Sequence, residues 1–319
     1  MYAKGQGIVL NEPTVIALNE QTREVLAVGH EAWHMIGRTP SYIVAVRPLR
    51  KGAITDFDVT QRMIRLLLER SGLSRLSRPR VLICVPSAIT TVERRAVEEA
   101  ARRAGAAGAF LIEQPVAAAI GSGLPINEPM GNMVIDIGGG TTEVAVMSLG
   151  GVVALQAIRV GSFDLDASIQ SYVKREHGMA IGERTAEEIK ITIGCAQPVV
   201  EERLAEVRGR DLMSGLPKKI VLRSSEIAVA VEEQVRAIVD AVIRCLSKTP
   251  PELAQDLSLY GINLVGGGGL LPGLAQRISD DTRTPVNLVE MPLESVVLGA
   301  GRCIENFDDL KSMFVGADR

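Results

Sequence analysis

The chain has 319 residues, 46% of them apolar and 23% charged, and this length allows two hydrophobic cores because a single core stops growing at roughly 250 to 300 residues. Its formal net charge of -3 argues against a broad cationic surface, so nucleic acid is not an expected partner. The four cysteines form no CxxC pair, and no apolar run approaches the roughly 18 residues of a membrane span, so we expect a chain of the reducing cytoplasm that is soluble or peripheral to a membrane.

Short β-branched runs alternate with helical patterns along the chain, which is typical of α/β proteins. Residues 58–72 predict a helix with one apolar face, and Gly72 can take the left-handed conformation that ends it. That face consists of Val59, Met63, Leu66 and Leu67. The predicted strands include residues 81–85, 133–137 and 262–265.

Two further helices can be predicted from their ends or their length. Thr90 and Glu93 predict a capping box at the start of one helix, which Gly105 ends. Residues 225–248 contain the longest helical pattern. Turn-forming residues at 125–131 predict a domain boundary, so we expect a first domain at 1–126 and a second domain at 127–319.

A glycine cluster follows the predicted strand at 133–137 and precedes a second apolar run at 144–147. Without Cβ atoms, successive backbone N–H groups can approach a phosphate, and threonine hydroxyls can donate further hydrogen bonds. Asp136 could hold a metal-bound water beside this turn. The alternative is a tight hairpin whose glycines only supply positive φ angles. The predicted phosphate-binding residues are Gly138, Gly139, Gly140, Thr141 and Thr142.

A second glycine cluster ends the strand at 262–265 and is predicted to open a helix. A helix N-terminus at this point would direct free N–H groups towards an anionic ligand. The alternative is that the glycines allow a helix to pack closely on a strand. Neither cluster matches the P-loop or the dinucleotide-binding fingerprint. The second cluster consists of Gly266, Gly267, Gly268 and Gly269.

Residues 182–190 read as the start of a helix, on which Glu187 and Lys190 lie three positions apart and share a face. Both side chains could bind the ribose or the base of a nucleotide. The alternative is an exposed ion pair between them, which would contribute only about a few tenths of a kcal/mol.

The two glycine clusters and residues 182–190 occur in the order and with the separation seen in the MreB family of bacterial actin-like proteins. The resemblance extends to residues 7–13, 35–40, 92–96 and 216–217, so it covers nearly the whole chain. It implies an α/β, actin-like fold of two ribonuclease-H-like domains with a nucleotide cleft between them, which binds ATP and Mg2+. It also implies small subdomains at about 13–55 and about 165–230.

The function that this resemblance implies is that of a cell shape-determining cytoskeletal protein. Family members polymerise into filaments at the inner face of the cell membrane and organise cell-wall elongation. The expected partners are therefore further copies of the chain, this membrane and the elongation proteins, and the expected location is the cytoplasm, peripheral to the membrane. The alternatives are a non-hydrolysing filament paralogue and a small-molecule kinase of the same fold. A chaperone-like ATPase would need a longer C-terminal region.

Three features depart from the family pattern. Family members open with a strand and an Asp-x-Gly-Thr phosphate loop, whereas this chain starts in the segment that follows it, so we expect an N-terminally truncated sequence with weakened nucleotide binding. Gln114 stands where the family has the glutamate that polarises the attacking water. Ser162 and Phe163 replace a Gly-Asp pair near the γ-phosphate. With Gln114, Thr141 and Asp136 as the expected catalytic residues, we expect at most slow ATP hydrolysis.

Residues 30–37 spell HExxHxxG, which on a helix can bind zinc through His30 and His34 with Glu31 as the base. Pro40 occupies the position of a third histidine, and the glycines on both sides leave only a short helix. We therefore interpret this stretch as a surface helix and expect no metal site.

Residues 71–80 join a predicted helix to a predicted strand and carry Leu73 and Leu76 among serines and arginines. The leucines could enter the acyl boundary of a membrane while the arginines bind anionic headgroups. An ordinary polar loop with leucines folded inward is the alternative. The position matches the hydrophobic insertion loop of the MreB family, which favours membrane contact.

Overall fold

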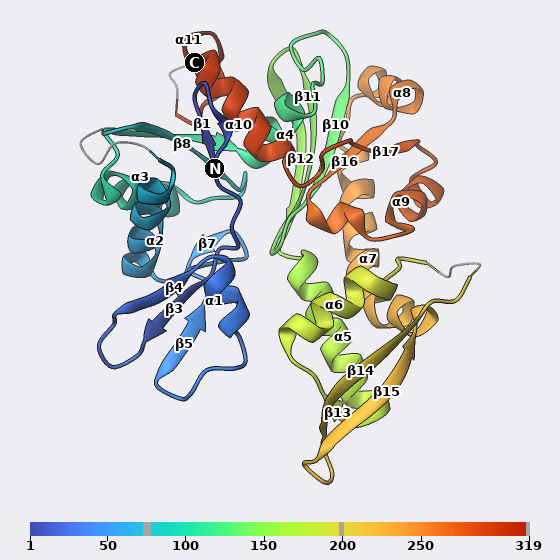
Figure 1. The fold of residues 1–319 in the computed structure, drawn as a ribbon. Coiled ribbons are helices and arrows are strands. Elements are labelled where there is room, and N and C mark those ends of the chain that lie inside the picture. Colours follow the sequence, from blue (N-terminus) through green and yellow to red (C-terminus); the bar gives the residue numbers. More distant parts are fainter. Residues whose placement is uncertain (73–77, 198–200, 317–319) are drawn as a thin grey trace. The chain divides into compact units, whose positions relative to one another are not determined.

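The structure is a computed structural model that describes residues 1–72, 78–197 and 201–316, except for the side chain of residue 50. The chain divides into two compact units: residues 1–125 with 294–319 form unit 1, and residues 126–293 form unit 2. Figure 1 labels most of the elements of both. Each unit has hydrophobic clusters of its own.

The N-terminal part of unit 1 is the three-stranded sheet β4-β3-β5. Side chains alternate along β3, so Ile16 packs with α2 and Ala17 with α1. The predicted apolar face of α2 is confirmed, because its valine, methionine and leucines join one cluster. The elements are β3 (Ile16–Asn19), β4 (Val25–Val28), α1 (His30–Met35), β5 (Ile43–Val46) and α2 (Phe57–Arg70).

The second part of unit 1 pairs β8 (Arg80–Val85) in parallel with β9 (Gly108–Glu113), and α3 (Thr91–Ala104) connects them. The predicted capping box of α3 is confirmed: the Thr90 N–H donates to Glu93 Oε2 at 2.8 Å, and the Glu93 N–H donates to Thr90 Oγ1 at 3.2 Å. Gly105 ends the helix at φ 117°. The remaining elements are α4 (Gln114–Gly121) and two short pairs, β1 (Tyr2–Ala3) with β2 (Gly7–Ile8) and β6 (Leu49–Arg50) with β7 (Ala53–Ile54).

The C-terminal helices α10 (Ser295–Glu305) and α11 (Phe307–Leu310) belong to unit 1, whereas the sequence analysis placed them in the second domain. The physical reason is close helix packing. A Cβ at Gly121 would collide with the Ser295 carbonyl, and a Cβ at Gly299 would collide with the Ala117 carbonyl. The backbones of α4 and α10 are therefore in direct contact, and α10 packs against α4 and β8 of unit 1.

Unit 2 contains the five-stranded sheet β12-β11-β10-β16-β17. Strands β10 to β12 are antiparallel, whereas β10, β16 and β17 are parallel. Every residue of β10 is buried, as a central strand covered on both faces requires. The predicted strands are confirmed, and the sheet consists of β10 (Asn132–Ile137), β11 (Thr142–Ser148), β12 (Gly151–Ile158), β16 (Ile262–Val265) and β17 (Val286–Leu288).

The rest of unit 2 joins the same hydrophobic cluster as this sheet. A second, three-stranded sheet has the order β13-β14-β15. Its strands and the accompanying helices are α5 (Ser162–His177), β13 (Met179–Ala180), α6 (Glu183–Ile193), β14 (Leu204–Asp211) and β15 (Pro217–Arg223).

The longest predicted helix is confirmed as α7 (Ser224–Leu246), which spans 23 residues and packs on β11 and β12. The shorter α8 (Pro251–Tyr260) packs on β10, and α9 (Leu274–Thr282) packs on β17. Of the helices that the structure describes, none combines the length and the apolar character needed to cross a membrane.

We expect Gly299→Ala to lower the free energy of unfolding by about 1–3 kcal/mol, because the added methyl group would displace the backbone of α4. Urea denaturation of the full chain measures this change. Gly108→Ala is the matched control, since a Cβ there would meet the Phe110 ring at an ordinary 3.5 Å. Equal stability of the two variants would show that α4 and α10 can separate at little cost.

Candidate functional site

The first predicted phosphate turn connects β10 to β11 and is closed by a hydrogen bond from the Gly138 N–H to the Thr141 carbonyl at 2.9 Å. The first residues of α5 lie against its outer side. The Ser162 N–H donates to the Gly138 carbonyl at 2.9 Å, and the Phe163 N–H donates to the Gly139 carbonyl at 2.8 Å. Within the described part of the chain, the Gly139 and Gly140 N–H groups donate no hydrogen bond. The turn thus retains backbone donors for a ligand.

The two threonines of this turn differ in their surroundings. Thr142 is fully buried, and its hydroxyl donates to the Val160 carbonyl at 2.8 Å. That hydroxyl is engaged within the protein, contrary to the prediction that it would donate to a phosphate. Thr141 is partly exposed, so its hydroxyl remains available at the turn.

The second glycine cluster was predicted to open a helix, and this prediction is wrong. Residues 267–270 form a single 3-10 turn, and α9 begins only at Leu274. Gly266 has a φ of 82°, and a Cβ on it would lie 2.6 Å from Asp136 Oδ1. A Cβ on Gly268 would collide with the Ile137 side chain. Close packing on β10 therefore explains part of this cluster.

Both glycine clusters lie at the same edge of the five-stranded sheet. Because β10 and β16 are parallel, with Asp136 opposite Val265, their carboxyl ends coincide and the two turns that follow them are neighbours. Ligands of open α/β sheets bind at the carboxyl ends of parallel strands. This parallel pairing gives the candidate site its location.

Asp136 lies at the centre of this edge and is only 5% exposed. Burial raises the pKa of its carboxyl group from 3.8 to about 6. At neutral pH the group is still mostly ionised. A carboxylate beside both glycine turns suits the predicted role of holding a metal-bound water.

Lys190 does not pair with Glu187, the exposed alternative that the sequence left open. Its ammonium group lies 2.8 Å from Asp166 Oδ1 and donates to Ser162 Oγ at 2.6 Å and to the Ser162 carbonyl at 3.3 Å. Burial is the largest influence on Asp166 and raises its pKa to about 6, against the opposite effect of Lys190. The structure thus ties α6 to the start of α5, and Glu187 remains partly exposed beside this pair.

The pairing of Lys190 with Asp166 was not predicted. Asp166 is 24 positions away in the chain, and no local motif links the two residues. A buried acid on the apolar face of a helix was the available signal, since such an acid requires a cation. Phe163 was noted as a departure, and its ring lies over Gly139, where a Cβ would meet it at 2.7 Å.

Three predicted site residues do not belong to unit 2. Gln114 is the first residue of α4 in unit 1, so its role in turnover stays a prediction. Leu73 and Leu76 lie outside the described residues.

The HExxH stretch forms the six-residue helix α1. His30 Nε2 lies 3.2 Å from the Asn11 carbonyl, and the His34 ring packs edge-on against Trp33. Among residues 1–72, 78–197 and 201–316, no three or more histidine, cysteine or acidic side chains form a group that could hold a metal ion.

Comparison with solved structures shows which class of protein this architecture defines. MreB5 of Spiroplasma citri bound to ADP matches with a TM-score of 0.92 and 35% identity, over 98% of this chain and 94% of that chain. A MamK double helical filament matches with a TM-score of 0.80 and 20% identity, over 94% of each chain, which shows the fold alone. The fold is the actin-like fold.

Sequence comparison then identifies the family. The model of the MreB/Mbl protein family matches residues 1–312. The cell shape-determining protein Mbl of Bacillus subtilis (strain 168) is 45% identical over 97% of this chain and 93% of its own length. The cell shape-determining protein MreB of Escherichia coli (strain K12) is 49% identical over 97% of this chain and 90% of its own length. The chain belongs to the MreB/Mbl family.

The buried carboxyl group of Asp136 predicts a pH dependence of stability. The pKa of this group in the folded state, about 6, exceeds its ordinary value of 3.8. Between these two pH values the folded state holds a proton that the unfolded state has already lost. The stability of the folded state therefore falls as the pH rises through this range. Asparagine does not titrate, so the free energy of unfolding of Asp136→Asn minus that of the parent should increase by up to about 3 kcal/mol between about pH 4 and about pH 7.

Urea denaturation across this pH range measures the difference. Asp240→Asn, at an exposed position of α7, is the control and should follow the parent at every pH. A constant difference between Asp136→Asn and the parent would contradict the assignment of a buried, titrating carboxyl group.

Proposed function

We propose that the chain is a cell shape-determining cytoskeletal protein that binds ATP with Mg2+ and polymerises into filaments. One observation carries the nucleotide proposal: the parallel pairing of β10 with β16 places two glycine turns at one sheet edge, and one of these turns retains free backbone donors. The relatives named above support the cellular role. The structure of MreB5 from Spiroplasma citri bound to ADP supports a nucleotide ligand.

The individual residues divide between ligand contacts and packing. The N–H groups of Gly139 and Gly140 and the Thr141 hydroxyl would bind phosphate oxygens. Asp136 would hold water bound to Mg2+, which supplies charge neutralisation at the phosphates when bound. Glu187 would contact the ribose or the base. The other predicted residues would shape the site. They are Gly138, Thr142, Lys190, Gly266, Gly267, Gly268 and Gly269.

Hydrolysis is proposed to be slow. Gln114 can orient water through its amide carbonyl but cannot accept a proton at neutral pH. Phe163 places an aromatic ring against Gly139, where family members have a carboxylate nearby. A filament protein that binds ATP without hydrolysing it remains the alternative.

The proposed partners are further copies of the chain, the inner face of the cell membrane and the cell-wall elongation proteins. The proposed location is the cytoplasm, peripheral to the membrane. Leu73 and Leu76 are the proposed membrane contact of unit 1.

Thr141→Val tests the phosphate turn while keeping the shape of the side chain. Loss of the hydroxyl should weaken ATP binding by roughly 10-fold to 100-fold, since a hydrogen bond to a charged group contributes about 1.5–3 kcal/mol. Calorimetric titration with ATP and Mg2+ measures the affinity.

Thr142→Val is the matched control for this test, because the neighbouring hydroxyl is bonded to the Val160 carbonyl. It should lower stability while leaving ATP affinity nearly unchanged. If both variants bind ATP as the parent does, the turn does not hold the phosphates.

Gln114→Glu tests the proposed reason for slow turnover. A carboxylate can accept the proton of the attacking water, and a general base contributes typically about 10² to 10⁴-fold, so phosphate release should rise by at least about 10-fold. The assay is phosphate release during assembly, with Gln114→Ala as a variant that should be slower than the parent. An unchanged or lower rate in Gln114→Glu would show that Gln114 does not face the attacking water.

A further inference from the structure

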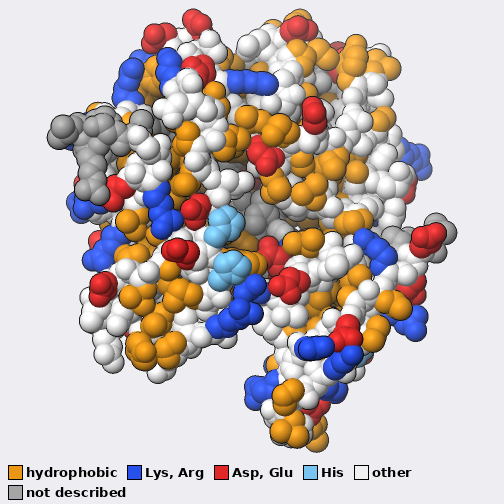
Figure 2. Space-filling view, viewed as in Figure 1, with side chains coloured by type: hydrophobic (Ala, Val, Ile, Leu, Met, Phe, Trp, Pro, Cys, Tyr) orange, Lys and Arg blue, Asp and Glu red, His pale blue; other side chains and the backbone are white. Residues whose placement is uncertain are grey.

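The β14–β15 hairpin of unit 2 ends in an exposed apolar turn. Residues 212–216, here called the hairpin tip, follow β14 and precede β15. Met213 is 95% exposed, Leu216 is 64% exposed and Leu212 is 41% exposed. Figure 2 shows hydrophobic side chains gathered at the end of this hairpin, with basic side chains along it. Adjacent exposed apolar side chains on a protruding turn indicate a binding surface.

The hairpin tip is held in one conformation by Asp211. Its Oδ1 atom accepts hydrogen bonds from the Met213 N–H at 3.1 Å, the Ser214 N–H at 2.8 Å and the Ser214 hydroxyl at 2.9 Å. Lys218 Nζ lies 3.0 Å from Asp211 Oδ2. The bonds from Ser214 and the contact with Lys218 hold the pKa of Asp211 well below its ordinary value. The apolar side chains are therefore presented by an ordered turn, so little conformational entropy is lost on binding.

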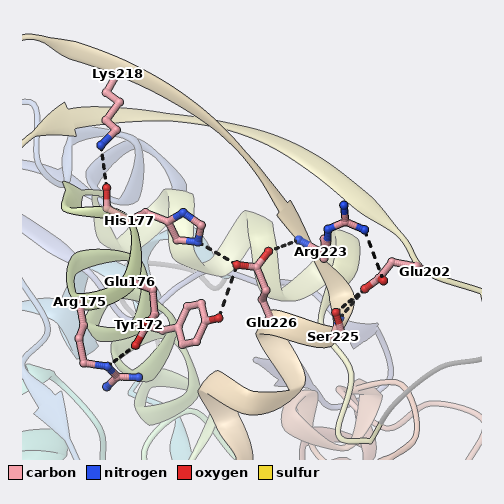
Figure 3. A network of polar contacts seen from close by, with 9 residues as sticks. All are labelled: Tyr172, Arg175, Glu176, His177, Glu202, Lys218, Arg223, Ser225 and Glu226. Carbon is pink, nitrogen blue, oxygen red and sulfur yellow. Dashed lines mark hydrogen bonds and ion pairs between the residues drawn. The ribbon is translucent and has the colours of Figure 1, made fainter.

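The hairpin is also anchored to the helices behind it, as Figure 3 shows. Lys218 Nζ donates to the His177 carbonyl at the end of α5 at 2.7 Å. His177 Nε2 lies 2.8 Å from Glu226 Oε1, and Glu226 Oε2 accepts the Arg223 N–H at 2.9 Å. These contacts join the hairpin to α5 and α7, so a force on the tip is transmitted to the body of unit 2.

Basic residues lie along the hairpin that carries the tip. Four basic residues lie between positions 208 and 219. Three of them form ion pairs within the hairpin: Lys218 with Asp211, and both Arg208 and Lys219 with Glu206. Arg210 is exposed and forms no ion pair among the residues that the structure describes. Lys174, in the last turn of α5, adds an exposed cation near Gly178, whose carbonyl accepts the Leu212 N–H at 2.9 Å. The basic residues of the hairpin are Arg208, Arg210, Lys218 and Lys219.

We propose that the hairpin tip docks onto an anionic lipid surface, with Leu212, Met213 and Leu216 entering the acyl boundary and the basic residues meeting the headgroups. Apolar side chains with surrounding cations are the composition of a peripheral membrane contact. A protruding turn suits a soft surface that admits single side chains, whereas a protein partner would need a matching groove. The residues of this contact differ from those of the nucleotide site and from those of the loop at residues 71–80.

The test is co-sedimentation of the full chain with vesicles, without nucleotide and below the concentration of assembly. Vesicles of phosphatidylglycerol mixed with phosphatidylcholine are compared with vesicles of phosphatidylcholine alone. Met213→Ser, Leu216→Ser should weaken binding to the anionic vesicles by roughly 10-fold or more, because two apolar side chains lose their burial. Arg210→Glu should weaken it by about 10-fold, and this loss should shrink at high salt.

Matched controls separate a local contact from a general change of surface. Val229→Ser, Leu259→Ser removes two similarly exposed apolar side chains from α7 and α8, and Arg244→Glu reverses an exposed charge on α7. Both should bind vesicles as the parent does. Leu73→Ser, Leu76→Ser reports on the other loop, and the hairpin variants should weaken binding in this background too.

A spectroscopic measurement shows insertion directly. The chain has one tryptophan, Trp33, so Trp33→Phe removes all tryptophan fluorescence. In this background, brominated lipid should quench the fluorescence of Met213→Trp but not that of Leu259→Trp.

Either of two results would overturn the proposal. The first is that the hairpin variants bind vesicles as the control variants do and that Met213→Trp is quenched no more than Leu259→Trp. The second is loss of assembly in vesicle-free solution with unchanged vesicle binding, which would make the tip a contact between copies of the chain.

Discussion

The candidate site depends on one interaction, the parallel pairing of β10 with β16. These strands are separated by more than a hundred residues, yet their register sets Asp136 opposite Val265 and brings both glycine turns to one edge. Shifting this register by one residue would turn Asp136 to the opposite face of the sheet and remove the turns from each other. The burial of every residue of β10 explains why the register is strongly specified. The chemistry of the site therefore rests on the packing of a central strand.

The glycines of the two turns serve both close packing and ligand binding, which the sequence had presented as alternatives. Gly268 is required because a side chain there would collide with Ile137, and Gly266 because of its positive φ and its closeness to the Asp136 carboxyl group. The same absence of side chains lets a backbone turn approach the sheet edge. In the β10–β11 turn, the carbonyl groups of Gly138 and Gly139 accept hydrogen bonds from α5, which leaves the N–H side of the peptides for a ligand. Local sequence could not separate these uses.

The features that sequence predicted well are those fixed by near neighbours. The capping box of Thr90 and Glu93 needs only three residues of spacing, and the apolar face of α2 follows the helical period. What failed depended on contacts that are distant in the chain. The Thr142 hydroxyl turns to Val160, and α10 joins unit 1 because Gly299 admits the backbone of α4. The helix predicted at Gly266 is a single 3-10 turn because close contact with β10 holds the chain there.

The buried pair of Lys190 and Asp166 shows how such a distant contact changes the meaning of a motif. An ammonium group has three donors, and here its neighbours are Asp166 Oδ1, Ser162 Oγ and the Ser162 carbonyl. Removing the ammonium would leave the Asp166 charge buried without its partner, which is far more costly than losing an exposed pair. Lys190 therefore acts by fixing α6 against the start of α5, and through Ser162 this support reaches the Gly138 carbonyl. Glu187, one turn earlier on the same helix, is the side chain that this support leaves available to a ligand.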